Sequence, residues 1–226
     1  MGSVKLIYNK TNFEFMIPSD WLPIAQRLHA LAQTGLAFTE SDYDRERYQE
    51  IKDISIQLLS EMSNVPIEHI IRLFPSEIGY QTPKVDIRAV IFRGKNELLM
   101  VQEKADNDRW AIPGGWADVG YSPFEVAEKE VWEETGLEVK AVRLLAVFDK
   151  KKHPHPAQPW YVYKFFVLCE ITGGELLSHT SETSAIEWIR FDAVSELPVS
   201  VDRVTYTQLE TMFLFAENPD LPTLCD

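Results

Sequence analysis

Hydrophobic and polar positions divide the chain into two parts with different periodicities. In residues 20–74 apolar residues recur every three or four positions, which predicts three helices. The helices are expected at about residues 20–34, 41–63 and 67–74. Ser19 is placed to cap the first helix and Gly35 to end it. The expected apolar stripes are Leu22, Ala25, Leu28, Leu31 and Ala32, then Ile51, Ile54, Leu58, Leu59 and Met62, then Ile67, Ile70, Ile71 and Phe74.

This helical part is too short to bury a large core. A single core of about 55 residues supplies little stability, so we expect the helices to pack on the rest of the chain or on a second copy. Before them, residues 1–19 form an N-terminal strand or tail, in which two alternating runs within residues 4–17 predict a hairpin.

Residues 75–84 resemble a linker, and after them the apolar pattern becomes that of strands. Strand-like runs occupy residues 85–92, 97–103, 109–115, 137–149, 160–171 and 186–191. One helix, from Pro123 to Thr135, lies among them, and a second, over about residues 204–216, follows the last strand. Strands mixed with two main helices predict an α/β sandwich for residues 85–226.

The first of these two helices carries an unusual group of acids. Glu130, Glu133 and Glu134 project within a sector of about 100°, given 100° per residue. Like charges four residues apart destabilise a helix, and its C-terminal end disfavours anions. A divalent cation would reverse both effects, and oxygen ligands suit Mg²⁺ or Mn²⁺ rather than zinc. The alternative is a solvated acidic helix face.

Two glycines precede this helix and favour the cation hypothesis. Gly114 and Gly115 allow the backbone to approach a ligand closely. The helix boundaries are also well marked, because Ser122 and Glu125 form a capping box and Gly136 follows the last helical residue.

The segment from residue 114 to 139 resembles the Nudix box, G-x5-E-x7-R-E-U-x-E-E-x-G-U, where U is aliphatic. The matching residues, at the right spacing, are Gly115, Glu130, Val131, Glu133, Glu134, Gly136 and Leu137. Two positions depart from the pattern: Tyr121 stands in place of its first Glu, and Lys129 in place of its Arg. Lys cannot reproduce the paired hydrogen bonds with which that Arg orients the neighbouring Glu.

A longer resemblance, over about residues 20–215, is to a bacterial Nudix subgroup that has an N-terminal helical domain and includes CDP-choline pyrophosphatase. It implies a Nudix-type α/β/α sandwich with a mixed sheet, preceded by a small helical domain. It also implies a homodimeric, Mg²⁺-dependent hydrolase of a nucleoside-diphosphate derivative, with Mn²⁺ as the alternative metal. The expected metal ligands are Gly114, Glu130, Glu133 and Glu134. Lys129 would steady Glu130, and Glu182, in a loop, resembles an extra ligand or general base.

Substrate-binding residues are harder to predict. His153 and His155 lie in a basic loop, which favours phosphate contact unless the loop is simply exposed. Trp110, Trp116, Trp160 and Tyr163 could stack on a base or face a choline cation, or pack in the core instead. CDP-choline is the substrate expected first, and ADP-ribose is the alternative.

Composition limits the expected cellular location and the expected binding partners of the chain. The 226-residue chain has a net charge of −13, which disfavours a stable nucleic-acid partner. Its two cysteines lie far apart, and it has neither an apolar run of about 18 residues nor a signal-peptide pattern. We therefore expect a cytoplasmic protein without membrane contact. A non-catalytic nucleotide sensor is the competing hypothesis; Tyr121 and Lys129 favour it, and the three retained glutamates oppose it.

Overall fold

The computed structural model describes residues 21–73 and 79–226, and the chain divides into two compact units, Met1–Gln81 and Thr82–Asp226. The predicted hairpin within residues 4–17, the Ser19 cap and Phe74 lie outside the described residues. In the described residues, no helix combines the length and apolarity needed to span a membrane.

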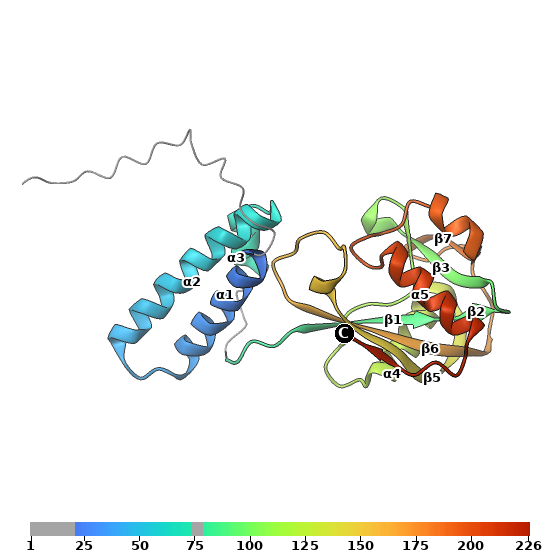
Figure 1. Cartoon of the computed structure of the whole chain (residues 1–226), viewed down its shortest axis with the longest axis horizontal. Coiled ribbons are helices and arrows are strands. Elements are labelled where there is room, and N and C mark those ends of the chain that lie inside the picture. Colours follow the sequence, from blue (N-terminus) through green and yellow to red (C-terminus); the bar gives the residue numbers. More distant parts are fainter. Residues whose placement is uncertain (1–20, 74–78) are drawn as a thin grey trace, which may run out of the picture. The chain divides into compact units, whose positions relative to one another are not determined.

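The first unit contains α1 (Trp21–Phe38), α2 (Asp42–Ser63) and α3 (Ile67–Leu73). Figure 1 shows α1 and α2 side by side, joined by a short loop. Ser41 caps α2 by accepting a hydrogen bond from the backbone of Asp44. Inside the pair, His29 Nδ1 lies 3.1 Å from Ser55 Oγ, and both residues are buried.

One prediction about these helices was wrong. Gly35 does not end α1, which continues to Phe38. A Cβ atom at Gly35 would lie 2.5 Å from ring atoms of Tyr48, so this glycine allows close packing of α2 on α1. In addition, four residues of the expected apolar stripes are exposed: Leu31, Ile51, Ile54 and Ile71.

The second unit has two four-stranded sheets. One sheet is mixed, in the order β1 (Lys84–Val90), β6 (Val162–Gly174), β5 (Leu137–Asp149) and β8 (Leu224–Cys225). The other is antiparallel, with β2 (Phe92–Arg93), β4 (Arg109–Ala111) and β7 (Thr183–Arg190) joined through β3 (Glu97–Glu103).

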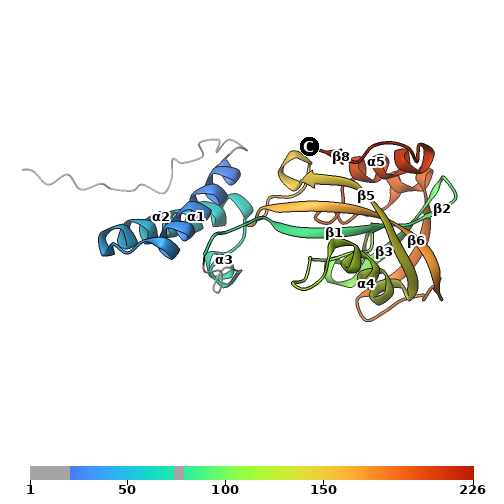
Figure 2. The same ribbon diagram turned by 90° about the horizontal axis from the view of Figure 1, so that it is seen from below.

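Helices α4 (Pro123–Thr135) and α5 (Tyr206–Glu217) cover this unit, and Figure 2 shows strands β1, β6 and β5 between them. One buried apolar cluster joins Val126 and Val131 of α4 to Ile87 of β1, and a separate one joins Leu209 and Met212 of α5 to the strands. The predicted α/β sandwich, preceded by a helical region, is confirmed.

The acid-bearing helix has the predicted bounds because its caps form. Ser122 Oγ accepts from the backbone N–H of Glu125, and the Glu125 carboxylate accepts from the N–H of Ser122. At the other end Gly136 takes a left-handed conformation, with φ of 77°. These caps fix which helix turn faces the loop that follows β4.

Candidate active site

A cavity of about 370 Å³ opens in the second unit, beside β1 and α4. Most of its lining is charged. The lining residues are Asp86, Arg88, Glu103, Gly114, Gly115, Trp116, Glu130, Glu134, Lys150, Gln158, Val162, Lys164, Glu182, Asp202 and Arg203.

The loop after β4 forms one wall of the cavity because it is bonded to β1. The N–H of Ile87 donates to the carbonyl of Gly115 at 2.8 Å. Gly114 has φ of 145°, and a Cβ atom there would lie 2.0 Å from the Ile87 carbonyl oxygen. At Gly115 a Cβ atom would lie 2.8 Å from a carboxylate oxygen of Glu130. At Gly114 only glycine lets the backbone lie this close to β1, and at Gly115 a side chain would push the Glu130 carboxylate aside.

The acidic side of the cavity centres on α4. Glu134 is 3% exposed, and its carboxylate accepts from the N–H of Gly114 at 2.9 Å. Burial, followed by the charge of Glu103, raises the pKa of Glu134 to about 8, and burial also raises the pKa of Glu130. Carboxylates held close together and away from water resist ionisation, and a bound cation removes that resistance.

The carboxylates of Glu130 and Glu134 and the backbone carbonyl of Gly114 suit a hard divalent cation, since all three are oxygen ligands. Among residues 21–73 and 79–226, however, no three acidic, His or Cys side chains are already grouped to hold a metal ion. The cavity thus has ligands of the right chemistry without a preassembled cage.

Glu133 and Lys129 contact each other rather than the cavity. Lys129 Nζ donates to Glu133 at 2.8 Å and lies 4.0 Å from Glu130. The expected support of Glu130 by Lys129 is therefore a long contact. The acids nearest to Tyr121 in the sequence do not line the cavity: Glu125 is used in the helix cap, and Asp118 lies 3.9 Å from Lys129.

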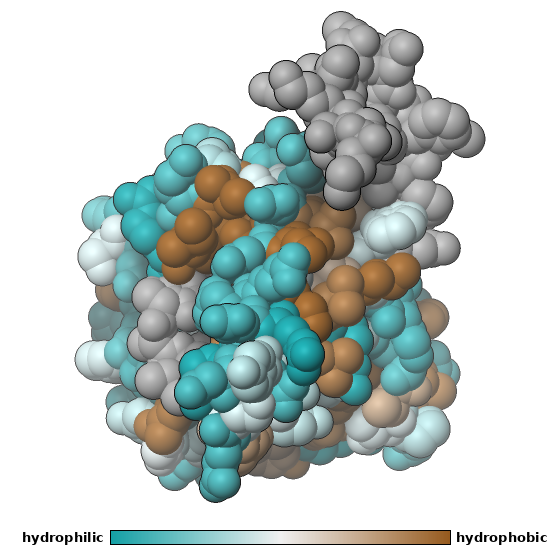
Figure 3. Space-filling view, turned by 90° about the vertical axis from the view of Figure 1, so that its left-hand side faces the viewer, coloured by the Kyte–Doolittle hydropathy of each residue, from teal (hydrophilic) through white to brown (hydrophobic). Residues whose placement is uncertain are grey.

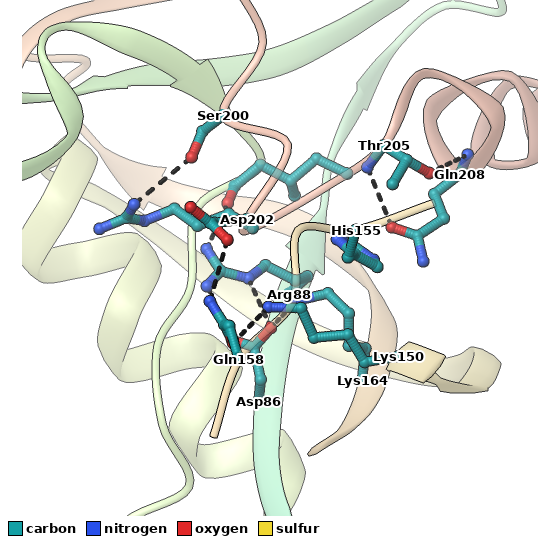
Figure 4. A network of polar contacts seen from close by, with 12 residues as sticks. Asp86, Arg88, Lys150, His155, Gln158, Lys164, Ser200, Asp202, Thr205 and Gln208 are labelled. Atoms are coloured by element: carbon teal, nitrogen blue, oxygen red, sulfur yellow. Dashed lines mark hydrogen bonds and ion pairs between the residues drawn. The ribbon is translucent and has the colours of Figure 1, made fainter. Parts of the chain in front are cut away.

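The basic side of the cavity comes from strands β1 and β6 and the loops beside them (Figure 4). Arg88 holds Asp86 through two hydrogen bonds, of 2.7 and 3.2 Å, and Lys164 contacts the same carboxylate. Burial opposes ionisation of Asp86, yet the charges of Arg88 and Lys164 keep its pKa below the usual value. Arg203 pairs with Glu103 at 3.0 Å.

Sequence reasoning missed most of this basic side. Asp86 and Arg88 alternate with the apolar residues Val85, Ile87 and Ala89 in β1, and Lys164 interrupts the apolar run of β6. Charged residues at buried strand positions are rare unless they are paired. These charged residues within apolar strands were the feature of the sequence from which the basic side of the cavity could have been predicted.

The predicted substrate-binding residues are placed differently from one another. Trp116 lines the cavity, half-exposed, and meets Trp160 edge to face at 6.5 Å. Tyr163 does not line the cavity; it packs on Tyr161. Glu182 lines the cavity from the loop before β7.

The two loop histidines contact the protein itself. His153 Nε2 pairs with Asp226 at 2.6 Å, and its ring packs on Phe148. His155 Nδ1 donates to the carbonyl of Val201 at 2.6 Å. Neither lines the cavity. Burial lowers the pKa of His155 to about 3, so its ring is neutral and is a poor partner for phosphate.

Comparison with known proteins accounts for both units. Residues 82–209 match the NUDIX domain, and residues 19–74 match a domain described as "UDP-X-like, N-terminal oligomerisation domain". A putative ADP-ribose pyrophosphatase of Bacillus subtilis (strain 168) is 42% identical over 93% of this chain and 99% of its own.

Solved structures show the same relationship. A UDP-X diphosphatase is 32% identical, with a TM-score of 0.57 over 92% of this chain and 98% of its own. An ADP-ribose pyrophosphatase from Streptococcus suis is 37% identical, with a TM-score of 0.56 over 64% of this chain and 100% of its own. The chain therefore belongs to the Nudix family, as its sequence predicted, and is a pyrophosphohydrolase.

Proposed function

We propose that this protein is a Mg²⁺-dependent hydrolase that splits the phosphoanhydride bond of a nucleoside-diphosphate derivative. The observation that carries this proposal is a cavity in which the carboxylates of α4 and the cationic side chains of β1 and β6 line one space. CDP-choline and ADP-ribose are the two substrates to compare.

Charge supports a diphosphate as the ligand. Six carboxylates and four cationic side chains line the cavity, so its formal charge is −2. A diphosphate joined to a nucleoside and a second group also carries two negative charges. The cavity and the diphosphate would therefore repel each other unless divalent cations lie between them, and Mg²⁺ is the usual partner of phosphate oxygens.

Each side of the cavity then has its own part in the reaction. Glu130 and Glu134 would hold the metal, with the Gly114 carbonyl and Glu133 as the further ligands predicted from the sequence. A bound divalent cation neutralises phosphate oxygens and activates water for attack on phosphorus. The arginine and lysine side chains opposite orient the diphosphate.

We propose that Glu182 accepts the proton, because it lines the cavity from the loop before β7 and not from α4. The attacking water gives up a proton to it while a new P–O bond forms and the bridging P–O bond breaks. Hydrolysis of CDP-choline in this way gives CMP and phosphocholine, and hydrolysis of ADP-ribose gives AMP and ribose phosphate.

Different observations support the two substrates. Trp116, at the cavity, has an exposed aromatic surface that suits either a base or a trimethylammonium group. The Bacillus and Streptococcus relatives support ADP-ribose, and the UDP-X diphosphatase supports a wider range of nucleoside-diphosphate derivatives.

The deciding experiment is a substrate panel with products identified by mass. CDP-choline, ADP-ribose and a UDP-sugar are each incubated with Mg²⁺ or Mn²⁺, and the reaction is repeated in ¹⁸O-water to identify the phosphorus that is attacked. We expect two products from at least one substrate. If kcat/KM for ADP-ribose is at least tenfold higher than for CDP-choline, ADP-ribose becomes the preferred substrate. Nucleotide binding without any turnover would contradict the proposal.

We further propose that the protein is a homodimer assembled through its helical unit. The oligomerisation domain matched by residues 19–74 supports this, as do the four exposed residues of the expected apolar stripes. Figure 3 shows apolar patches among hydrophilic residues on the face turned to the viewer.

A further inference from the structure

Three lysines follow β5 in a short turn of 3-10 helix, Lys150–Lys152, and the first differs from the other two. Lys150 is only 8% exposed and lines the cavity. Lys151 and Lys152 are exposed and do not line it. One turn of the chain thus sends a single ammonium group toward the proposed diphosphate site.

Lys150 also differs from the other cations of the cavity. Arg88 and Lys164 share the carboxylate of Asp86, and Arg203 pairs with Glu103. In the described part of the chain, no carboxylate lies within 4.0 Å of Lys150 Nζ, whose hydrogen-bond acceptor is the amide oxygen of Gln158. A buried ammonium group without an anionic partner is costly, so such groups are normally paired.

The neighbouring side chains hold this ammonium group in place. Gln158 donates from Nε2 to Asp202 at 2.9 Å, which turns its amide oxygen toward Lys150 (Figure 4). Farther along the loop, His153 is paired with Asp226 and His155 with the Val201 carbonyl. The loop predicted to contact phosphate through its histidines therefore offers its first lysine instead.

We propose that Lys150 binds a phosphoryl oxygen of the diphosphate substrate, with Gln158 and Asp202 orienting its ammonium group. A phosphoryl oxygen would supply the missing countercharge through a charge-assisted hydrogen bond. The proposal rests on the proposed function, since it assigns the diphosphate to this cavity.

Two measurements on three variants test the proposal. Lys150→Met removes the charge at similar length, Lys150→Arg keeps the charge, and Lys152→Met is the matched control in the same turn. We expect Lys150→Met to weaken binding of inorganic pyrophosphate, titrated calorimetrically with Mg²⁺, by at least tenfold. KM for the hydrolysed substrate should rise in parallel. Lys150→Arg should retain more of the pyrophosphate affinity and a lower KM than Lys150→Met. Lys152→Met should match the wild type in both measurements.

Melting temperature separates a binding role from a structural one. Lys150→Met should melt no lower than the wild type, because it removes a buried charge. The proposal is overturned if Lys150→Met keeps wild-type affinity, if Lys152→Met loses as much, or if a lower melting temperature accompanies the loss. A wild type that binds pyrophosphate yet hydrolyses no member of the panel would contradict the proposed function alone.

Discussion

The carboxylate of Glu134 carries the most demanding role assigned to any single residue in this site. It is buried, accepts one backbone hydrogen bond and lies near other acids. Glutamine keeps the acceptor for Gly114 while removing the charge that a metal needs. A glutamine here can therefore abolish the proposed metal binding and still keep the side chain's place in the fold.

We predict that Glu134→Gln lowers kcat by about 10²-fold or more, because a neutral amide is a weak metal ligand. The melting temperature of the metal-free protein should not fall, since burying an amide costs less than burying a carboxylate. Steady-state kinetics at saturating Mg²⁺ measures the effect. Near-normal turnover would remove Glu134 from the metal site.

Tyr121, where the chain departs from the Nudix box, has a structural role in our reading. Its side chain is half-exposed and precedes the Ser122 cap of α4, where an apolar residue can staple the helix start. We predict that Tyr121→Phe is nearly neutral for activity and that Tyr121→Glu does not raise it. A 10²-fold loss in Tyr121→Phe at unchanged melting temperature would instead give the hydroxyl a part in the reaction.

Lys150 gives a pH-dependent prediction whose direction is fixed. Burial, followed by the charge of Lys164, lowers its pKa to about 8 from an ordinary value of 10.5. Between these pH values the unfolded chain keeps a proton that the folded protein has released, so this residue's contribution to stability rises with pH. Lys150→Met should therefore be more stable than the wild type at pH 7, by a margin that shrinks toward pH 10.5. Urea unfolding at both pH values measures it, and a constant margin would contradict the prediction.

Among the helices and strands, the sequence was sufficient to predict the bounds of an element where residues next to its ends determine them. The ranges of α4, β3 and β5 were predicted without error, because caps, glycines and alternation are read from neighbouring residues. Strand β8 was missed, since its two residues become a strand only by pairing with β5 far away in the sequence. The same limit applies to Asp86 and Lys164, which meet only when β1 and β6 pair in parallel.

Gly35 shows why the expected end of α1 was wrong. A glycine near a helix end usually marks a C-cap, but here it makes room for the Tyr48 ring. We predict that Gly35→Ala destabilises the helical unit by about 1–3 kcal/mol through overpacking, despite the better helix propensity of alanine. Thermal unfolding of Gly35→Ala, Tyr48→Ala and the double variant tests it. Additive effects in this cycle would show that the ring is not the cause.

For the whole molecule, the separation into two units places the cavity in one unit and the surface that we propose for assembly in the other. All residues that line the cavity lie between 86 and 203, within the unit Thr82–Asp226, which also holds both large apolar clusters. The helical unit has fewer buried apolar residues and leaves several large ones exposed. Its size and its surface both suggest that it is stabilised by association.

We predict that the helical unit carries the homodimer contact, so deletion of residues 1–74 converts a dimer into a monomer. Light scattering should give twice 26.0 kDa for the full chain, and the mass of one truncated copy for the deletion variant. Circular dichroism shows whether the remaining unit is folded. As a test in the intact chain, Ile54→Glu places a charge on an exposed apolar position of α2 and should weaken the dimer while preserving the helix. A truncated protein that stays dimeric, or a full chain that is monomeric at micromolar concentration, would contradict this assignment.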